Sequence, residues 1–502
     1  MRLKNKDVIL VPVVVIAGKI VSFVFNAILG AYYGAGKISD AFLMAHSIPT
    51  ILFDGVATAF ISCYIPIYSS LKYESPEKID DFNSNMTSIS FSVSLSITLI
   101  YFTFHEQINR LYAKGFDDES LNLFNAYSEI LVWSIPFIGA YAILRGHLQV
   151  LGKKAVSSIG QVVCYMLLIV SVILFFPNDK AISWATLAGN ILCFFLFLVF
   201  AIKTGYRYRV YISFKETYIK SFLLMIFPIF FSTLVSELAS IVDKFFASQH
   251  SSGIITSLTN GYQLSFSIQG IISASLLIVV FPVLADKAAR KDEIGVNNVV
   301  YTCVNTVCWA VFPLVVGGIL LSEPIIAILF GHGKYSVQST KITALIFSGY
   351  LLGVLPMCIK HIGDRTCYAL KKTNYSMITT FITVGMNIVL DYVMNKIWGY
   401  MGLVIATSIS ILLGSITTIV LIKRKNRSLS YKRIMHSFLC PGICSLIMGI
   451  VIYLLKLFVS RYSINNILLL ILSISLGVVV YIGAAFLLFR KHLYEVIRSF
   501  KK

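Results

Sequence analysis

The stretch YMGLVIATSISILLGSITTIVLI, residues 400–422, carries no charge and ends at Lys423-Arg424-Lys425. An α-helix rises about 1.5 Å per residue, so this stretch is long enough to cross a bilayer core of about 30 Å. Similar stretches fill the rest of the chain, and all are too long and continuous for barrel strands, which would alternate over about ten residues. We therefore predict an all-α polytopic membrane protein with about fourteen spans. The predicted spans are residues 8–33, 43–68, 86–104, 127–150, 157–176, 182–202, 221–246, 262–285, 299–321, 341–359, 375–396, 400–422, 434–456 and 465–489.

The composition excludes a soluble globular protein. Hydrophobic residues make up 57% of the 502 residues and charged residues only 13%, whereas a soluble protein has about a quarter charged residues. The net charge of +19 could indicate nucleic-acid binding, but 31 of the 42 Lys and Arg fall in cytoplasmic segments if the N-terminus lies inside. That bias follows the positive-inside rule. We interpret the charge as topology and contact with anionic lipid, with no nucleic-acid partner, and expect both termini in the cytoplasm.

The aqueous connections are short. The longest, 105–126 outside and 203–220 inside, hold only about twenty residues each. The sequence contains no G-x-x-x-x-G-K-[ST] loop, so the chain carries no ATPase of its own. The loops offer neither a metal-binding carboxylate pair nor room for a sugar-nucleotide site, which disfavours a membrane transferase. We expect a transporter rather than an enzyme, with no catalytic residue and no cofactor.

A weak internal repeat divides the chain. Lys153-Lys154 precede the fifth span, and Ala185-Thr186 lie in the sixth. About 220 residues later, Lys371-Lys372 precede the eleventh span, and Ala406-Thr407 lie in the twelfth. Such similarity between halves is typical of secondary transporters, whose site lies between two bundles. The predicted parts are an N-terminal lobe of six helices (1–210), a C-terminal lobe of six helices (211–430), and two final helices with a basic cytoplasmic tail (431–502).

Polar side chains within the spans suggest an ion site. Asn387 and Asp391 are four residues apart, so both lie on one helical face. Asp243 lies deep in the seventh span. Thr407 lies in the twelfth, where its hydroxyl can bond to the carbonyl of Leu403 four residues back. Two carboxylates, an amide oxygen, a hydroxyl and a carbonyl suit a hard monovalent cation. The alternative is that each group caps, packs or bonds between helices on its own.

Ionisable residues also occur in the first two spans. Lys19 has about ten apolar residues on each side, which places it too far from either membrane surface to snorkel easily. Asp40 and His46 fall near the start of the second span. Together they suggest a cationic spot in a central cavity, beside an acid that pairs with it or gates it. For His46 a satisfied interfacial histidine is the simpler interpretation, and Glu237 in the seventh span could face the same cavity.

Several short motifs follow one another in a fixed order. They are Gly34-Ala35-Gly36, Asp40-Ala41-Phe42, Ile48-Pro49, Ile65-Pro66, Phe281-Pro282-Val283-Leu284, Glu323-Pro324-Ile325 with Leu329-Phe330 and Gly333, and Tyr368-Ala369-Leu370-Lys371-Lys372-Thr373. Over residues 8–490 this order resembles the MviN/MurJ family of lipid II flippases, within a superfamily that includes multidrug and polysaccharide exporters. The resemblance implies two six-helix lobes around a V-shaped central cavity, and a groove for a lipid tail along the last two helices.

The resemblance also implies a task and an ion site. The task is to move an undecaprenyl-pyrophosphate-linked peptidoglycan precursor from the inner to the outer leaflet of the bacterial cytoplasmic membrane. The family's sodium site maps onto Asp243, Asn387, Asp391 and Thr407, with Leu403 supplying a carbonyl. All of its side-chain ligands are therefore kept in this sequence.

The cavity arginines of the family are not kept. At the first such position the chain has Lys19, a cation without the bidentate fork of arginine. The other arginine positions hold Phe25, Ser47 and Gln263, and the acidic neighbour of the second is Asn26. Three cavity residues do match the family: Asp40, Lys360 and Arg365. His46, beside Ser47, could partly compensate for the lost charge.

We therefore expect a flippase coupled to sodium or protons, with a lipid-linked glycan precursor and membrane lipids as partners. The cell-wall synthesis machinery is a further candidate partner. The loss of three positive charges leaves two other cargoes open: a different polyprenyl-linked polysaccharide unit, such as an O-antigen or capsule repeat, or a cationic drug exchanged for an ion. A non-transporting scaffold in an envelope-building complex is the remaining alternative.

Overall fold

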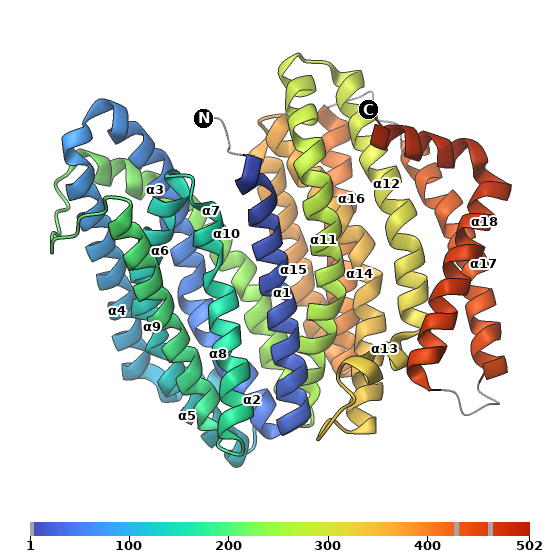
Figure 1. The fold of residues 1–502 in the computed structure, drawn as a ribbon, viewed down its shortest axis with the longest axis horizontal. Coiled ribbons are helices and arrows are strands. Elements are labelled where there is room, and N and C mark those ends of the chain that lie inside the picture. Colours follow the sequence, from blue (N-terminus) through green and yellow to red (C-terminus); the bar gives the residue numbers. More distant parts are fainter. Residues whose placement is uncertain (1–4, 426–430, 460–464, 502) are drawn as a thin grey trace. The chain divides into compact units, whose positions relative to one another are not determined.

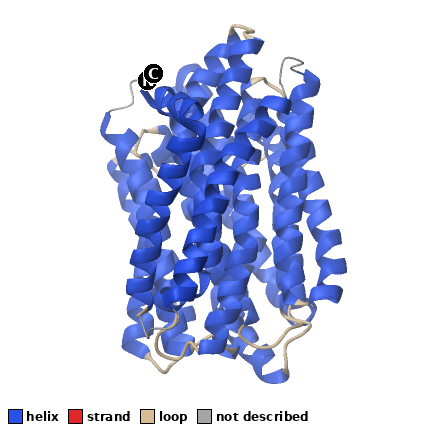
Figure 2. Ribbon diagram, turned by 90° about the vertical axis from the view of Figure 1, so that its right-hand side faces the viewer, coloured by secondary structure: helices blue, strands red, loops and turns tan. Residues whose placement is uncertain are grey.

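The computed structural model describes residues 5–425, 431–459 and 465–501. These residues form helices and short connections without any strand, as Figures 1 and 2 show. Among the described residues, thirteen helices are long and apolar enough to cross a membrane. A further helix, α11 (Ile254–Ala289), contains the eighth predicted span. The predicted all-α polytopic fold is confirmed.

The chain folds as two compact units, Met1–Thr256 and Ser257–Lys502. The boundary between the units falls in the first turn of α11, and the lobe boundary predicted at residue 430 lies outside the described residues. The helices of the first unit are α1 (Asn5–Tyr33), α2 (Lys37–Pro49), the π-helix η1 (Thr50–Asp54), α3 (Gly55–Glu74), the 3-10 helix η2 (Pro76–Lys78), α4 (Ile79–Tyr112), α5 (Asp118–Val132), α6 (Ser134–Val150), α7 (Lys154–Ser158), α8 (Gly160–Phe175), α9 (Lys180–Lys203) and α10 (Thr217–Ala247).

The second unit carries most of α11 and all later helices. These are α12 (Glu293–Leu320), α13 (Ser322–Leu329), α14 (Val337–Ala369), α15 (Thr373–Trp398), α16 (Tyr400–Lys425), α17 (Tyr431–Val459) and α18 (Asn466–Lys501). The two C-terminal helices, α17 and α18, pack against each other and against α12, beside which Figure 1 draws them in red. Cys444, Ala485 and Trp309 form a buried cluster at this junction.

The helices extend beyond the predicted spans, so some connections are shorter than expected. The link between α4 and α5 is shorter than the stretch 105–126 predicted as a connection, because α4 continues to Tyr112 and α5 begins at Asp118. Hydropathy marks only the apolar part of a helix, whereas the polar turns at its ends are equally helical. The short helix α13 lies in a connection where no helix was predicted.

Hydrogen bonds hold the short connection between α4 and α5 in place. The Asp117 Oδ1 atom accepts a hydrogen bond from the backbone N–H of Ser120 at 3.1 Å, which caps α5. The Lys37 ammonium lies 2.5 Å from Asp117 Oδ2 and lowers the pKa of this carboxyl to about 2. Because the pKa is lowered, the stabilising contribution is complete above about pH 4 and is lost as the pH falls through about 2.

The connection between α9 and α10 is fastened to α4. The side-chain amide of Asn85 donates to the carbonyl of Ser213 at 2.8 Å, and its Oδ1 accepts from the Ser213 N–H at 2.9 Å. Arg209 adds an ion pair to Asp81 and a backbone hydrogen bond to the Ser84 hydroxyl. The connection, predicted only as an aqueous loop, is therefore held by the buried polar start of α4.

Replacing Asn85 by alanine should loosen this connection. The change leaves a carbonyl and an N–H of Ser213 without their partner, at about 1–3 kcal/mol for each group that stays buried. We expect faster tryptic cleavage after Arg207 and Arg209, measured by limited proteolysis of the purified protein. Ser96→Ala on the same helix is the control, because its hydroxyl donates to the Ser92 carbonyl within α4. Unchanged cleavage of the Asn85 variant would contradict this account.

Small residues let α4 and α6 approach closely. The Ser90 hydroxyl donates to the carbonyl of Gly139 at 2.8 Å. A Cβ atom on Gly139 would lie 2.3 Å from the Ser94 hydroxyl and 2.9 Å from the Ser90 carbonyl oxygen. Close contact through small residues, with hydroxyls bonded across the helices, is a common way for helices to associate in lipid.

Gly139→Ala should therefore lower stability. We expect a loss of about 1–3 kcal/mol, the usual penalty of overpacking, seen as a lower apparent Tm of the detergent-solubilised protein. The control is Gly483→Ala on α18, where a new Cβ meets nothing within 4 Å. Both changes raise helix propensity equally, so the same Tm for both variants would argue against a tight α4–α6 contact.

Candidate functional site

Helix α15 carries its polar residues on the buried side and its apolar residues on the exposed side. Val389 and Val393 are 57% and 44% exposed. This pattern is expected of a membrane helix whose polar face points into the protein and whose apolar face meets lipid. The buried residues of α15 are Ser376, Thr379, Asn387 and Asp391.

The predicted ion ligands of the second unit lie on α15 and α16, which pack against each other. Asp391 is fully buried, and Asn387 lies one turn before it on the same buried face, as predicted. The predicted bond from the Thr407 hydroxyl to the Leu403 carbonyl is confirmed at 2.9 Å. Asp243 lies on α10 of the first unit and is partly buried; its part in the site stays a prediction.

Two glycines bring α15 and α16 together. A Cβ atom on Gly414 would lie 2.0 Å from the Thr383 hydroxyl oxygen, and one on Gly402 would lie 2.1 Å from the Met394 carbonyl oxygen. This contact gives the helix pair a carboxylate, an amide, a hydroxyl and a backbone carbonyl. These are the oxygen donors that hard cations bind. The residues of this unit therefore fit a sodium ion chemically.

Two cations of α14 in the second unit, Lys360 and Arg365, differ in how far they are neutralised. The Lys360 ammonium lies 3.0 Å from a carboxylate oxygen of Asp364, and both side chains are mostly buried. The other oxygen of Asp364 accepts from the Ser376 hydroxyl at 2.7 Å. Arg365 is exposed, with its guanidinium 5.7 Å from the centre of the Tyr368 ring. Asp364 was not predicted, although its spacing of four residues from Lys360 is a visible signal.

The same end of α14 carries a histidine that was not predicted either. The His361 Nδ1 atom lies 2.9 Å from the Gln269 side-chain amide of α11, and this amide is 2.8 Å from the Ser273 hydroxyl. Gln263, the predicted cavity residue of α11, is partly exposed. Periodicity does not identify such a contact, because nothing in the spacing relates α11 to α14.

Asp40 binds the start of α11. Its carboxylate accepts hydrogen bonds from the backbone N–H of Gly253 at 2.5 Å and of Thr256 at 2.7 Å, and from the Thr256 hydroxyl at 2.5 Å. All three partners lie in the first unit. A helix start has unpaired N–H groups and a partial positive charge, so a carboxylate is favourable there. This contact gives Asp40 a structural role, while its role in a cavity stays a prediction.

Two positions at which the resemblance implies arginine belong to the packed first unit. Phe25 is 2% exposed, with its ring centre 6.0 Å from that of Phe42 and 5.7 Å from that of Tyr165. The Ser47 hydroxyl donates to the Met44 carbonyl and lies 3.0 Å from the Tyr112 hydroxyl. Neither residue replaces the missing charge.

Lys19 has no carboxylate partner among the described residues. It lies on α1 and is partly exposed. Its neighbour Gly18 meets Gln161 of α8, whose side-chain oxygen would be 3.1 Å from a Cβ at that position. Lys19 therefore remains a candidate for binding an anionic head group.

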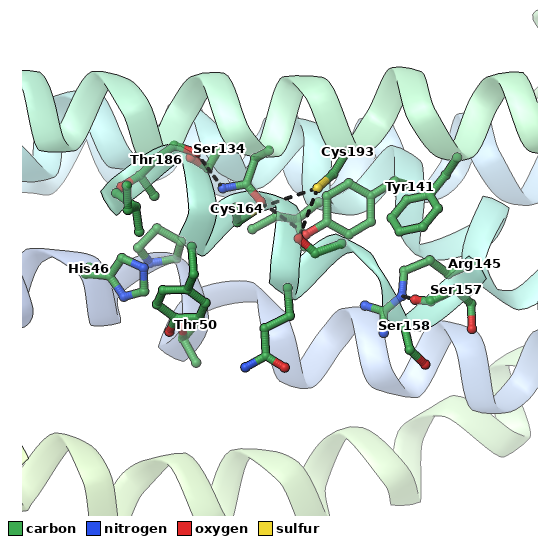
Figure 3. A pocket seen from close by; sticks show the side chains of 18 of the residues that line it. His46, Thr50, Ser134, Tyr141, Arg145, Ser157, Ser158, Cys164, Thr186 and Cys193 are labelled. Carbon is green, nitrogen blue, oxygen red and sulfur yellow. Dashed lines mark hydrogen bonds between the residues drawn. The ribbon is translucent and has the colours of Figure 1, made fainter. Parts of the chain in front are cut away.

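The first unit contains a pocket of about 420 Å³ among α1, α2, η1, α5, α6, α7, α8 and α9 (Figure 3). His46 is the predicted residue that lines it. The break between α2 and η1, after Pro49, places Thr50 in the wall. The pocket was not predicted, although Thr186 and Asn190, four residues apart on α9, are a signal of a polar helix face.

Comparisons with known proteins agree on one family. The family described as "Lipid II flippase MurJ" matches residues 29–473. A probable lipid II flippase MurJ of Vibrio cholerae is 24% identical over 422 residues, which cover 81% of this chain and 80% of that protein. The corresponding protein of Bdellovibrio bacteriovorus is 23% identical over 486 residues, which cover 94% and 92%.

Solved structures show the same fold. A lipid II flippase MurJ in an inward closed conformation matches with a TM-score of 0.84 and 25% identity, over 97% of this chain and all of that chain. An inward-facing multidrug resistance MATE family transporter of the MOP superfamily matches with a TM-score of 0.67 and 15% identity, over 82% and 95%. The second likeness concerns the fold alone.

Proposed function

Since the chain belongs to the MurJ family of lipid II flippases, we propose that it moves an undecaprenyl-pyrophosphate-linked peptidoglycan precursor from the inner to the outer leaflet of the bacterial cytoplasmic membrane. Family membership over residues 29–473 is the observation that carries this proposal. The protein is a multi-pass membrane transporter rather than a member of an enzyme family. The proposed orientation has both termini in the cytoplasm, because that placement gives the charge bias of the positive-inside rule.

Transport would be coupled to sodium or protons by alternating access. Asn387, Asp391, Thr407 and the Leu403 carbonyl would hold the ion, and Asp243 would add a second carboxylate. Moving a two-state population from 1:99 to 99:1 needs about 5.5 kcal/mol of differential binding. The membrane potential supplies about 2.3 kcal/mol per charge per 100 mV. One coupled cation could therefore bias the two conformations strongly.

The anionic head group would be attracted by Lys19 and Arg365. Lys360 contributes less, because Asp364 lies 3.0 Å from its ammonium. The isoprenoid tail would stay in lipid along α17 and α18, whose outer side chains are apolar; Leu454 and Val479, for example, are 57% and 68% exposed. The cell-wall synthesis machinery is a proposed partner on functional grounds alone.

One structural observation favours a second cargo. The buried Phe25, the hydrogen-bonded Ser47 and the Lys360–Asp364 pair leave fewer free positive charges than a pyrophosphate clamp of several arginines would have. A different polyprenyl-linked polysaccharide unit is therefore the second candidate.

Complementation separates the two candidates. Cells depleted of their resident lipid II flippase receive this chain, with its membrane level checked by immunoblot. We expect growth and normal cell shape to return if the proposal is correct. Failure of a well-expressed protein, together with rescue of a strain lacking a polysaccharide-unit flippase, would identify the second candidate instead.

A further inference from the structure

The pocket in the first unit has a wall that no part of the proposed transport cycle uses. Figure 3 shows His46 and Arg145 at opposite ends, with hydroxyl and thiol side chains between them. Its volume of about 420 Å³ lies within the range of about 300–1,000 Å³ typical of small-molecule sites. The volume is large enough for a small-molecule ligand, and the lining residues restrict the chemical class of that ligand.

The charge of the lining favours an anion. Arg145 is partly buried, and its Nε donates to the Ser157 carbonyl at 3.1 Å. Among the described residues no carboxylate pairs with it, and none of the residues that line the pocket is acidic. A cation in a membrane protein interior normally pairs with an anion or a carbonyl, or faces a water-filled cavity. The guanidinium also has a fork of donors that suits a carboxylate or a phosphate.

The rest of the lining favours hydroxyl groups. Ser134 is only 1% exposed, yet its hydroxyl has no hydrogen-bond partner among the described residues. An unpaired buried polar atom in a pocket wall is expected to meet a ligand or a water. The Asn190 amide, which donates to the Thr186 carbonyl at 3.0 Å, and the Thr186 hydroxyl add further polar surface along α9.

We propose that this pocket binds a hydroxyl-bearing anion of sugar size, such as an amino-sugar acid or a sugar phosphate. The anionic group meets Arg145, and the hydroxyls meet Ser134 and the polar face of α9. The ligand would be either the head group of the lipid-linked precursor or a free sugar phosphate. This part of the inference rests on the proposed function. The first unit would then hold the cargo at a site of its own.

Two native cysteines report on the pocket directly. The sulfurs of Cys164 on α8 and Cys193 on α9 are 3.4 Å apart, and both residues line the pocket. A ligand that fills the pocket should shield them from alkylation. Cys358, buried in the second unit, is the internal control because it lies outside this lining.

The experiment measures the rate at which iodoacetamide modifies each cysteine of the full-length protein in nanodiscs, by peptide mass spectrometry. The soluble probes are N-acetylglucosamine 1-phosphate, N-acetylglucosamine and inorganic phosphate, and lipid II is the lipid-linked probe. We expect saturable protection of Cys164 and Cys193 by the sugar phosphate at lower concentrations than by either part alone. Protection by lipid II only would identify the lipid head group as the source.

Variants test the role of the cation. Arg145→Gln should weaken protection by the sugar phosphate at least about tenfold, as expected for the loss of a charge-assisted hydrogen bond. Arg145→Lys should give an intermediate value, and it keeps the proposal testable if the glutamine variant misfolds. Arg290→Gln is the matched control, because Arg290 is exposed and pairs with Asp286.

Protection by none of the probes, or equal protection of wild-type and Arg145→Gln protein, would overturn the inference. These readouts need no transport. Protection without complementation would refute the proposed function alone, and complementation without protection would refute this inference alone.

Discussion

Asp391→Ala should yield a folded, membrane-inserted protein that no longer rescues cells depleted of their lipid II flippase. Asp391 is fully buried on the polar face of α15, one turn from Asn387. A charged side chain at the centre of a membrane helix is unfavourable by about 2.5–3.5 kcal/mol on insertion scales. Removing the carboxylate should therefore leave membrane insertion intact and eliminate only its function, which we propose is ion binding.

A direct measurement of ion binding accompanies the growth assay. A ligand present at a hundred times its Kd stabilises the state that binds it by about 2.7 kcal/mol. We expect the apparent Tm of the wild-type protein to rise when sodium chloride replaces choline chloride, and the Tm of Asp391→Ala and Asp391→Asn to stay constant. If the coupling ion is a proton, the Tm of the wild-type protein should depend on the pH rather than on the sodium concentration.

Val389→Ala is the matched control for Asp391. Val389 lies two residues earlier on the exposed side of α15 and is an ordinary lipid-facing position. The Val389→Ala protein should rescue growth, and its apparent Tm should still rise with sodium chloride. Full rescue of growth by Asp391→Ala would contradict ion coupling through this residue. It would instead support the alternative that the protein is a non-transporting scaffold.

Asp40→Ala should produce the largest loss of stability. The change leaves three donors without their acceptor: the N–H groups of Gly253 and Thr256, and the Thr256 hydroxyl. A buried donor that loses its partner is unfavourable by about 1–3 kcal/mol, and hydrogen bonds to charged groups lie at the upper end. We expect a total of at least about 3 kcal/mol, measured as a lower apparent Tm and less folded protein in size-exclusion chromatography.

The surrounding backbone cannot relax easily to compensate. Gly253 has a φ of +94°, and a Cβ atom there would lie 2.6 Å from the Ala35 carbonyl oxygen. The backbone at Gly253 therefore has a positive φ that favours glycine over residues with a side chain. Asp118→Ala, an exposed carboxylate in the first turn of α5, is the control and should change the Tm little.

Asp40→Asn distinguishes a structural role from a cavity role. Asparagine keeps one oxygen, which can accept from the two Thr256 donors, but its NH2 group cannot accept from the Gly253 N–H, so part of the stability should remain. A stable Asp40→Asn protein that fails to transport would support the predicted function of Asp40 as an acid in the cavity. An unchanged Tm for Asp40→Ala would contradict the anchoring of α11.

Features that depend on neighbours in the chain were predictable from the sequence. The spans follow from runs of apolar residues, since each helix satisfies its own backbone in lipid. The shared face of Asn387 and Asp391, and the bond from Thr407 to Leu403, follow from the helical period of 3.6. Helix ends were less predictable, as α4 and α5 show, because polar end turns lack a hydropathy signal.

Contacts between distant segments were decided only by the tertiary structure. Asp40 and Gly253 are 213 residues apart, and no periodicity joins them. Phe25 could have faced a cavity, but its packing against Phe42 and Tyr165 places it in the core. The pocket beside Arg145 exists because several helices leave space between them, whereas each helix alone carries only an unremarkable polar residue or two. The sequence pattern shows which face of a helix is polar, but only the packing of the helices determines which residues that face contacts.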